Sequence, residues 1–125
     1  MSTEPKRILI AEDNPDVNKF LFWVLVNGGY EVASASNGAQ AMELLSRIRF
    51  DAVLLDIIMP VMGGISFIEK IRKLGKPLPI IILSGHVDFL EAGRIKAWGV
   101  DRVLSKPTEP GELLAAVQQV TALAG

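Results

Sequence analysis

The stretch VLLDIIMPVMGG, residues 53–64, passes from an apolar segment directly to the carboxylate of Asp56, and then to a proline and two glycines. A continuous apolar run such as Val53–Leu55 is typical of a parallel strand that helices cover on both faces. A carboxylate at the end of such a strand lies beside the core, where its charge costs free energy unless another group compensates it. The stretch therefore predicts a buried strand with a charge at its carboxyl end and partners for that charge nearby.

Similar segments recur along the chain and alternate with segments of helical period. Five short segments are strand-like: 8–12, 31–35, 51–56, 80–85 and 102–106. Helical spacing or helix-boundary residues predict five helices: one carrying 17–25 after the start signals Asn14 and Pro15, then 39–48, 65–74, 87–98, and a last one from Pro110. Five strand–helix units predict an α/β fold, a single doubly wound parallel sheet with helices on both faces.

Length and composition fit one globular domain. The chain has 125 residues, of which 50% are hydrophobic and 22% charged, so it can bury a core. With 13 basic and 14 acidic residues, its formal charge of -1 gives no reason to expect binding to nucleic acid or to an anionic membrane. Because it has no cysteine, disulfides and thiolate metal sites are excluded. No apolar run approaches the roughly 20 residues that a membrane span requires, so we expect a cytoplasmic domain.

Polar side chains stand where four of the predicted strands end. Glu12 and Asp13 close the first strand, Asp56 the third, Ser84 the fourth and Lys106 the fifth. In a doubly wound parallel sheet, binding sites form outside the carboxyl ends of the strands. We therefore expect these five side chains to lie together.

This set of residues suits metal-assisted phosphoryl transfer. Clustered carboxylates favour a hard cation such as Mg²⁺, which is often completed by the phosphate of a substrate. Lys106 and Ser84 suit phosphate oxygens, and an aspartate can itself be a nucleophile that forms an aspartyl-phosphate. Gly63 and Gly64 are expected to let the loop after Asp56 adopt conformations closed to other residues.

Each of these pieces also has an ordinary structural explanation. Acids before Asn14 and Pro15 fit a helix N-terminus, Ser84 fits a loop hydroxyl, and Lys106 followed by Pro107 fits a plain strand end. Asp56 could be a capping aspartate. The placement of all of them at strand ends, in one layer of the predicted fold, favours a site.

The chain is similar from end to end to the receiver domains of two-component response regulators. Four pieces carry the similarity: the acid pair after ILIA (8–11), DIIMP with two glycines (56–64), SG (84–85) and KP (106–107). The resemblance implies a flavodoxin-like sheet of strand order 2-1-3-4-5 and a cis peptide bond between Lys106 and Pro107. We expect residues 1–125 to form a single receiver domain, with no output domain in this chain.

The resemblance also implies the chemistry. Asp56 would accept a phosphoryl group from the phosphohistidine of a sensor histidine kinase or a histidine phosphotransfer domain, and Ser84 and Lys106 would hold the phosphoryl oxygens. Mg²⁺ would be surrounded by three carboxylates and one backbone carbonyl: Glu12, Asp13, Asp56 and Ile58. The domain would then change conformation to signal to an output domain or protein, and any catalysis would be limited to its own phosphorylation and dephosphorylation.

Two positions depart from the common receiver pattern. The residue three before the lysine is usually aromatic and is Val103 here, so we expect the switch to depend on Ser84 and the loop 85–89. The acid pair is Glu-Asp rather than Asp-Asp, which should still bind metal. The lone histidine, His86, is expected to be a partly exposed loop residue near the site.

Two other functions remain as alternatives. A pseudo-receiver would be an interaction module that is never phosphorylated. An aspartate-nucleophile phosphatase of the haloacid dehalogenase type usually has an acid or hydroxyl two residues after the nucleophile, where Ile58 stands in this chain.

The first predicted helix offers a candidate docking surface. Its core-facing stripe is predicted to be Val17, Phe20, Leu21, Val24 and Leu25. That stripe leaves Phe22, Trp23 and Val26 on the outer face, where a partner could bind. The alternative is that Trp23 folds back over a neighbouring helix and belongs to the core.

Overall fold

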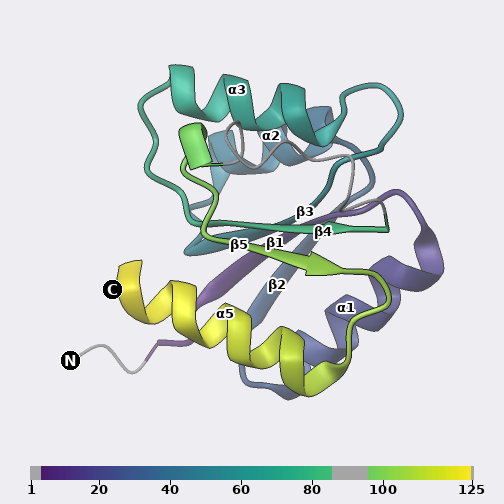
Figure 1. Cartoon of the computed structure of the whole chain (residues 1–125). Helices are drawn as coiled ribbons and strands as arrows, with labels where there is room; N and C mark the ends of the chain where they lie inside the picture. The colour runs from purple at the N-terminus through teal and green to yellow at the C-terminus, as the bar shows by residue number, and fades with distance from the viewer. Residues whose placement is uncertain (1–3, 86–95, 125) are drawn as a thin grey trace.

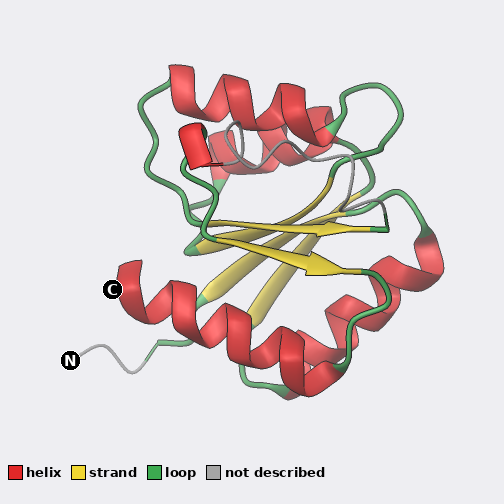
Figure 2. Ribbon diagram, viewed as in Figure 1, coloured by secondary structure: helices red, strands yellow, loops and turns green. Residues whose placement is uncertain are grey.

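The computed structural model describes residues 4–85 and 96–124, and it contains one parallel five-stranded sheet of order β2-β1-β3-β4-β5 (Figures 1 and 2). The strands are β1 (Arg7–Ala11), β2 (Glu31–Ala35), β3 (Ala52–Asp56), β4 (Ile80–Ser84) and β5 (Arg102–Ser105). Each begins and ends within one residue of its predicted bounds. The predicted fold class and strand order are confirmed.

Helices cover both faces of this sheet. On one face lie α1 (Pro15–Asn27) and α5 (Pro110–Ala124), and on the other α2 (Gly38–Arg47) and α3 (Gly64–Lys73), as Figure 1 shows. The described part of the chain therefore has four of the five predicted helices. The remaining one, predicted over 87–98, falls mostly on residues 86–95, which lie outside the described residues. No helix within the described ranges has the length and apolar character to cross a membrane.

The core is divided between the two faces of the sheet. Every residue of β3 and β4 is buried, which explains why these strands are continuously apolar up to their last residue. Side chains alternate between the two apolar clusters: Val53 and Leu55 pack on the side of α2 and α3, whereas Leu54 packs on the side of α1 and α5. The polar last residues of these strands, Asp56 and Ser84, are buried as well.

The predicted boundaries of α1 are confirmed, but its core-facing stripe is narrower than predicted. The Asn14 side chain accepts hydrogen bonds from the backbone N–H groups of Asp16 and Val17, and the helix ends at Gly28. Phe20, predicted to face the core, is 39% exposed. The reason is geometric: at about 100° per residue, Phe20 lies at the margin of a stripe centred on Leu21, Val24 and Leu25.

The two glycines of the β3–α3 loop have a different role from the one predicted. Neither has a positive φ; Gly63 has φ -76° and ψ 171°, an extended conformation open to any residue. Gly64 is required for space, because a Cβ there would lie 2.4 Å from the carbonyl oxygen of Asp56 and 2.9 Å from the Cα of Ile57. The loop thus folds tightly against the end of β3.

Substitution of Gly64 tests this close approach. We expect Gly64→Ala to lower the free energy of unfolding by about 2 kcal/mol, because the new methyl meets backbone rather than a flexible side chain. Gly111→Ala is the matched control, since a Cβ at Gly111 in α5 meets nothing within 4 Å, and alanine favours the helix by up to about 1 kcal/mol. Urea denaturation measures both, and equal stability of the two variants would contradict the proposed role of Gly64.

Candidate functional site

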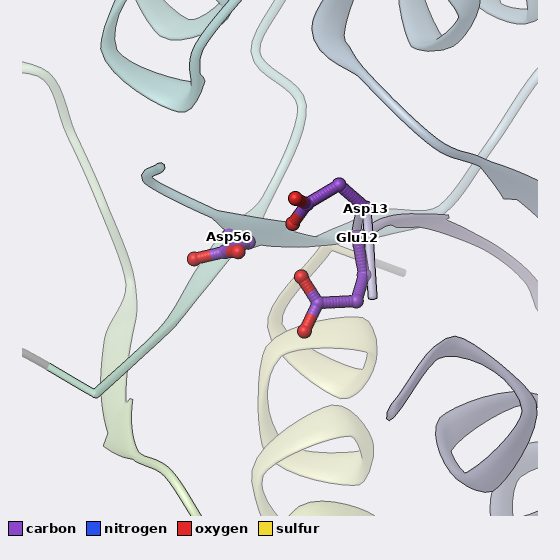
Figure 3. Close-up of side chains that lie close together, drawn as sticks. All are labelled: Glu12, Asp13 and Asp56. Atoms are coloured by element: carbon purple, nitrogen blue, oxygen red, sulfur yellow. The ribbon is translucent and has the colours of Figure 1, made fainter. Parts of the chain in front are cut away.

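The register of the sheet brings the predicted site residues to one edge. Ala11 pairs with Leu55 and Asp56 pairs with Leu83, so the residues that follow β1 lie beside the last residue of β3. Figure 3 shows the side chains of Glu12 and Asp13, from the end of β1, beside that of Asp56. Oxygens from these three carboxylates lie within 4.8 Å of one another. The predicted acid cluster is therefore present.

The cluster extends from the interior to the surface. Glu12 and Asp56 are buried, whereas Asp13 is exposed. The backbone of Glu12 is fixed on both sides: its N–H donates to the carbonyl of Ala35, and its own carbonyl accepts from the side-chain amide of Asn18 at 2.9 Å. These hydrogen bonds hold the backbone of Glu12 in place, and Asp13 lies where the acid cluster opens to solvent.

Lys106 brings a positive charge to these acids. Its ammonium forms ion pairs with the carboxylate of Glu12 and with Oδ2 of Asp56, the latter at 3.3 Å. Its backbone N–H donates to the carbonyl of Ser84 at 2.9 Å, which fixes it to the end of β4. The peptide bond to Pro107 is cis, as the resemblance implied. Burial lowers the pKa of Lys106, but the hydrogen bond to Glu12 and the charges of Asp56 and Glu12 outweigh it, so that the pKa is raised overall.

One carboxylate remains poorly compensated. Burial, with the neighbouring Asp56 carboxyl adding to it, raises the pKa of Glu12 to about 7, despite the opposing effect of Lys106. Its Oε2 atom is buried and has no hydrogen-bond partner among the described residues. Three carboxylates, one of them with an unpartnered buried oxygen, are the donor set that a hard divalent cation prefers. The residues present fit Mg²⁺.

The other predicted site residues lie around this cluster. Ser84 is buried at the end of β4, next to Asp56 at the end of β3. The backbone N–H of Ile58 lies 3.4 Å from Oδ1 of Asp56, and its side chain is 64% exposed. Val103 is partly buried and packs on the side of α2 and α3. His86 and residues 86–89 of the loop expected to move lie outside the described residues.

A groove beside the site was not predicted from the sequence. It has a volume of about 480 Å³ and runs between α1 and the start of the β5–α5 connection, lined by Asp16, Val17, Phe20, Leu21, Leu83, Lys106, Pro107 and Thr108. Phe20 lines the α1 side of the groove together with Asp16, Val17 and Leu21, and the prediction that Phe20 faces the core gave no indication of a groove there. Lys106 lines the groove and also pairs with Glu12 and Asp56, so the groove opens directly beside the acid cluster.

The outer face of α1 carries the exposed apolar residues that the helical period predicted. Trp23 is 65% exposed, and Phe22 and Val26 are exposed as well. The alternative that Trp23 belongs to the core is therefore wrong. Binding of a partner to this face remains a prediction.

Comparison with known proteins matches this geometry to a family. The family model described as the response regulator receiver domain matches residues 8–118. A response regulator receiver protein of Anaeromyxobacter sp. (strain Fw109-5) is 39% identical over 111 residues, which are 87% of this chain and 46% of that protein. The DNA-binding response regulator MtrA of Mycolicibacterium smegmatis is 32% identical over 118 residues, 94% of this chain and 51% of MtrA. The chain thus spans about half the length of these relatives.

A solved structure extends the similarity to three dimensions. The response regulator TrrA of Thermotoga maritima, crystallised in complex with Mg²⁺-BeF, superposes with a TM-score of 0.82 at 31% sequence identity. The match covers 92% of this chain and 98% of that one. With a family model spanning nearly its whole length and a matching fold, the chain belongs to the receiver domain family of two-component response regulators.

Proposed function

We propose that this receiver domain is a phosphoacceptor in which Asp56 takes a phosphoryl group, with Mg²⁺, from the phosphohistidine of a sensor histidine kinase or a histidine phosphotransfer domain. The observation that carries the proposal is the convergence of three carboxylates within 4.8 Å with Lys106, whose ammonium lies 3.3 Å from Oδ2 of Asp56. A pseudo-receiver would have no need of this complete set.

The reaction is a transfer between two nucleophiles. A carboxylate oxygen of Asp56 attacks phosphorus, the bond between phosphorus and the donor's imidazole nitrogen breaks, and its electron pair returns to the imidazole. Lys106 offsets negative charge on the transferring group, and the Ser84 hydroxyl at the end of the neighbouring strand donates to a phosphoryl oxygen. The product is an aspartyl-phosphate on Asp56 and a free donor histidine.

Glu12, Asp13, Asp56 and the backbone carbonyl of Ile58 would hold the Mg²⁺. When bound, the metal neutralises charge on the phosphoryl oxygens. The unpartnered Oε2 of Glu12 and the mutual repulsion of the three carboxylates support this assignment. The Mg²⁺-BeF complex of TrrA supports it by similarity.

The outer face of α1 is proposed to contribute to docking of the phosphodonor protein. This helix begins beside Glu12 and Asp13, so a protein that reaches Asp56 passes close to it (Figure 1). Phe22 and Trp23 give it an exposed aromatic surface. Tryptophan is among the residues most often found as an interface hot spot.

The acceptor assignment predicts the behaviour of Asp56→Asn. With phosphoramidate and Mg²⁺, the parent chain should gain one phosphoryl group by intact mass spectrometry, and Asp56→Asn should gain none, because an amide is not a nucleophile here. Asp16→Asn, which removes an exposed acid outside the cluster, should label like the parent. Full labelling of Asp56→Asn would show that the acceptor is wrongly assigned, and no labelling of the parent would favour the pseudo-receiver alternative.

The metal assignment predicts the Mg²⁺ dependence of Asp13→Asn. Loss of one negative charge beside a divalent cation should raise the Mg²⁺ concentration for half-maximal labelling by about tenfold. Because Asp13 is exposed, the variant should fold like the parent. Phosphoramidate labelling over a Mg²⁺ titration, again with Asp16→Asn as control, measures the change, and an unaltered midpoint would remove Asp13 from the metal site.

The docking assignment predicts a split between two donors for Trp23→Ala. Phosphoramidate labelling should be unchanged. The protein donor is the autophosphorylated histidine kinase of the source organism that phosphorylates the parent chain fastest. Transfer from this kinase should slow by about tenfold or more. Leu74→Ala, which removes an exposed apolar residue at the far end of α3, should affect neither reaction. Equal slowing with both donors would mean that Trp23 acts on the fold rather than on docking.

A further inference from the structure

One side chain on α1 joins the ends of β1 and β2 beside the acid cluster. Asn18 lies in the first turn of α1, and its amide nitrogen donates to the carbonyl of Glu12 at 2.9 Å and to the carbonyl of Ala35 at 3.2 Å. The N–H of Glu12 donates to the same Ala35 carbonyl at 3.0 Å. Because helix side chains lean toward the N-terminus of their helix, a residue here can reach back to the preceding strand. Asn18 therefore ties α1 to two strand ends at once.

The Glu12 carbonyl belongs to the peptide unit between Glu12 and Asp13. This peptide lies just beyond β1, which ends at Ala11, so the strand ladder does not fix the carbonyl. Because a peptide unit is planar, a bond that fixes its carbonyl also fixes the direction in which the chain enters the Cα of Asp13. The amide of Asn18 thus sets how two residues of the acid cluster are oriented relative to each other.

Asp13 depends on its backbone for its place in the cluster. Its side chain is exposed and borders a groove of about 300 Å³ between α1 and the end of β2, so packing does not hold it. Within residues 4–85 and 96–124, its carboxylate makes no hydrogen bond or ion pair. Repulsion from the carboxylates of Glu12 and Asp56, whose oxygens lie within 4.8 Å, acts to move it outward. The backbone bond from Asn18 opposes that movement.

We propose that Asn18 is a positioning residue for the metal site: its amide is not a ligand, and it holds the Glu12–Asp13 peptide in the orientation that lets three carboxylates share one Mg²⁺. The inference rests on the proposed function, because it requires that the acid cluster binds this cation. A site that is already arranged before the metal arrives loses less conformational freedom on binding. The alternative is a purely structural bond that joins α1 to the sheet.

Asn18→Ala removes the bridging amide. Alanine is the strongest helix former and the position is only half-buried, so α1 is retained. We expect the Mg²⁺ dissociation constant to rise by about tenfold, as is typical when a group that orients metal ligands is lost. An NMR titration with Mg²⁺ alone, followed through the backbone amide resonances of Glu12 and Asp13, measures it. At saturating Mg²⁺, phosphoramidate labelling should proceed at close to the parent rate, because Asp56 and Lys106 are unchanged.

Asn27→Ala is the matched control on the same helix. The Asn27 amide also donates to a backbone carbonyl, that of Trp23 at 2.8 Å, but it does so at the other end of α1. This variant loses the same chemical group and should bind Mg²⁺ like the parent. Asn18→Gln keeps an amide donor on a side chain one methylene longer, so its dissociation constant should lie between those of the parent and Asn18→Ala.

A purely structural bond would lower the melting temperature of Asn18→Ala and leave its Mg²⁺ dissociation constant unchanged, and this result overturns the proposal. So does equal weakening in Asn18→Ala and Asn27→Ala, or an Asn18→Gln variant that binds no better than Asn18→Ala. A parent that binds no Mg²⁺ also overturns it. Because the titration uses no phosphodonor, a parent that binds Mg²⁺ but is not labelled by phosphoramidate would remove the acceptor role of Asp56 and leave the role of Asn18 standing.

Discussion

Repulsion between carboxylates is the constraint around which this sheet edge is arranged. Glu12 and Asp56 are both buried, and Lys106 is the cation that pairs with both of them in the described structure. That pairing requires β5 to end beside β4, where the N–H of Lys106 meets the carbonyl of Ser84. The two apolar layers hold the strand ends in line. Even so, one ammonium does not balance three carboxylates, and burial, with the neighbouring Asp56 carboxyl adding to it, raises the pKa of Glu12 to about 7.

Much of the fold and the acid cluster could be predicted from the sequence, for identifiable reasons. Apolar β-branched runs mark strands covered on both faces, and β3 and β4 are buried throughout. The carboxyl ends of parallel strands lie at the same edge of the sheet. The polar residues that end the apolar runs are therefore expected to meet there, before any distance between them is known. The cis bond before Pro107 followed only from the family resemblance, since no local pattern requires it.

What could not be predicted depends on contacts between segments distant in sequence. The loop after Asp56 is held in place partly by the hydrogen bond from the N–H of Gly38 to the carbonyl of Met62, which joins this loop to the start of α2, more than twenty residues away in the sequence. The reason for Gly64 is likewise a clash with backbone rather than a dihedral angle. Phe20 was misplaced because a helical period predicts the centre of a buried stripe better than its margins.

The register of the strands fixes the residues at the strand ends independently of the exposed surface of α1. A slip of one residue in β3 would move Asp56 by about 3.3 Å and turn it to the opposite face of the sheet. The ladders between β1, β3 and β4 and the apolar layers on both faces oppose such a slip, so Asp56 stays beside the residues that follow β1. Trp23, by contrast, lies on the outer face of α1, outside those ladders. The side chains on that exposed surface can therefore change one at a time while the residues at the strand ends stay in register.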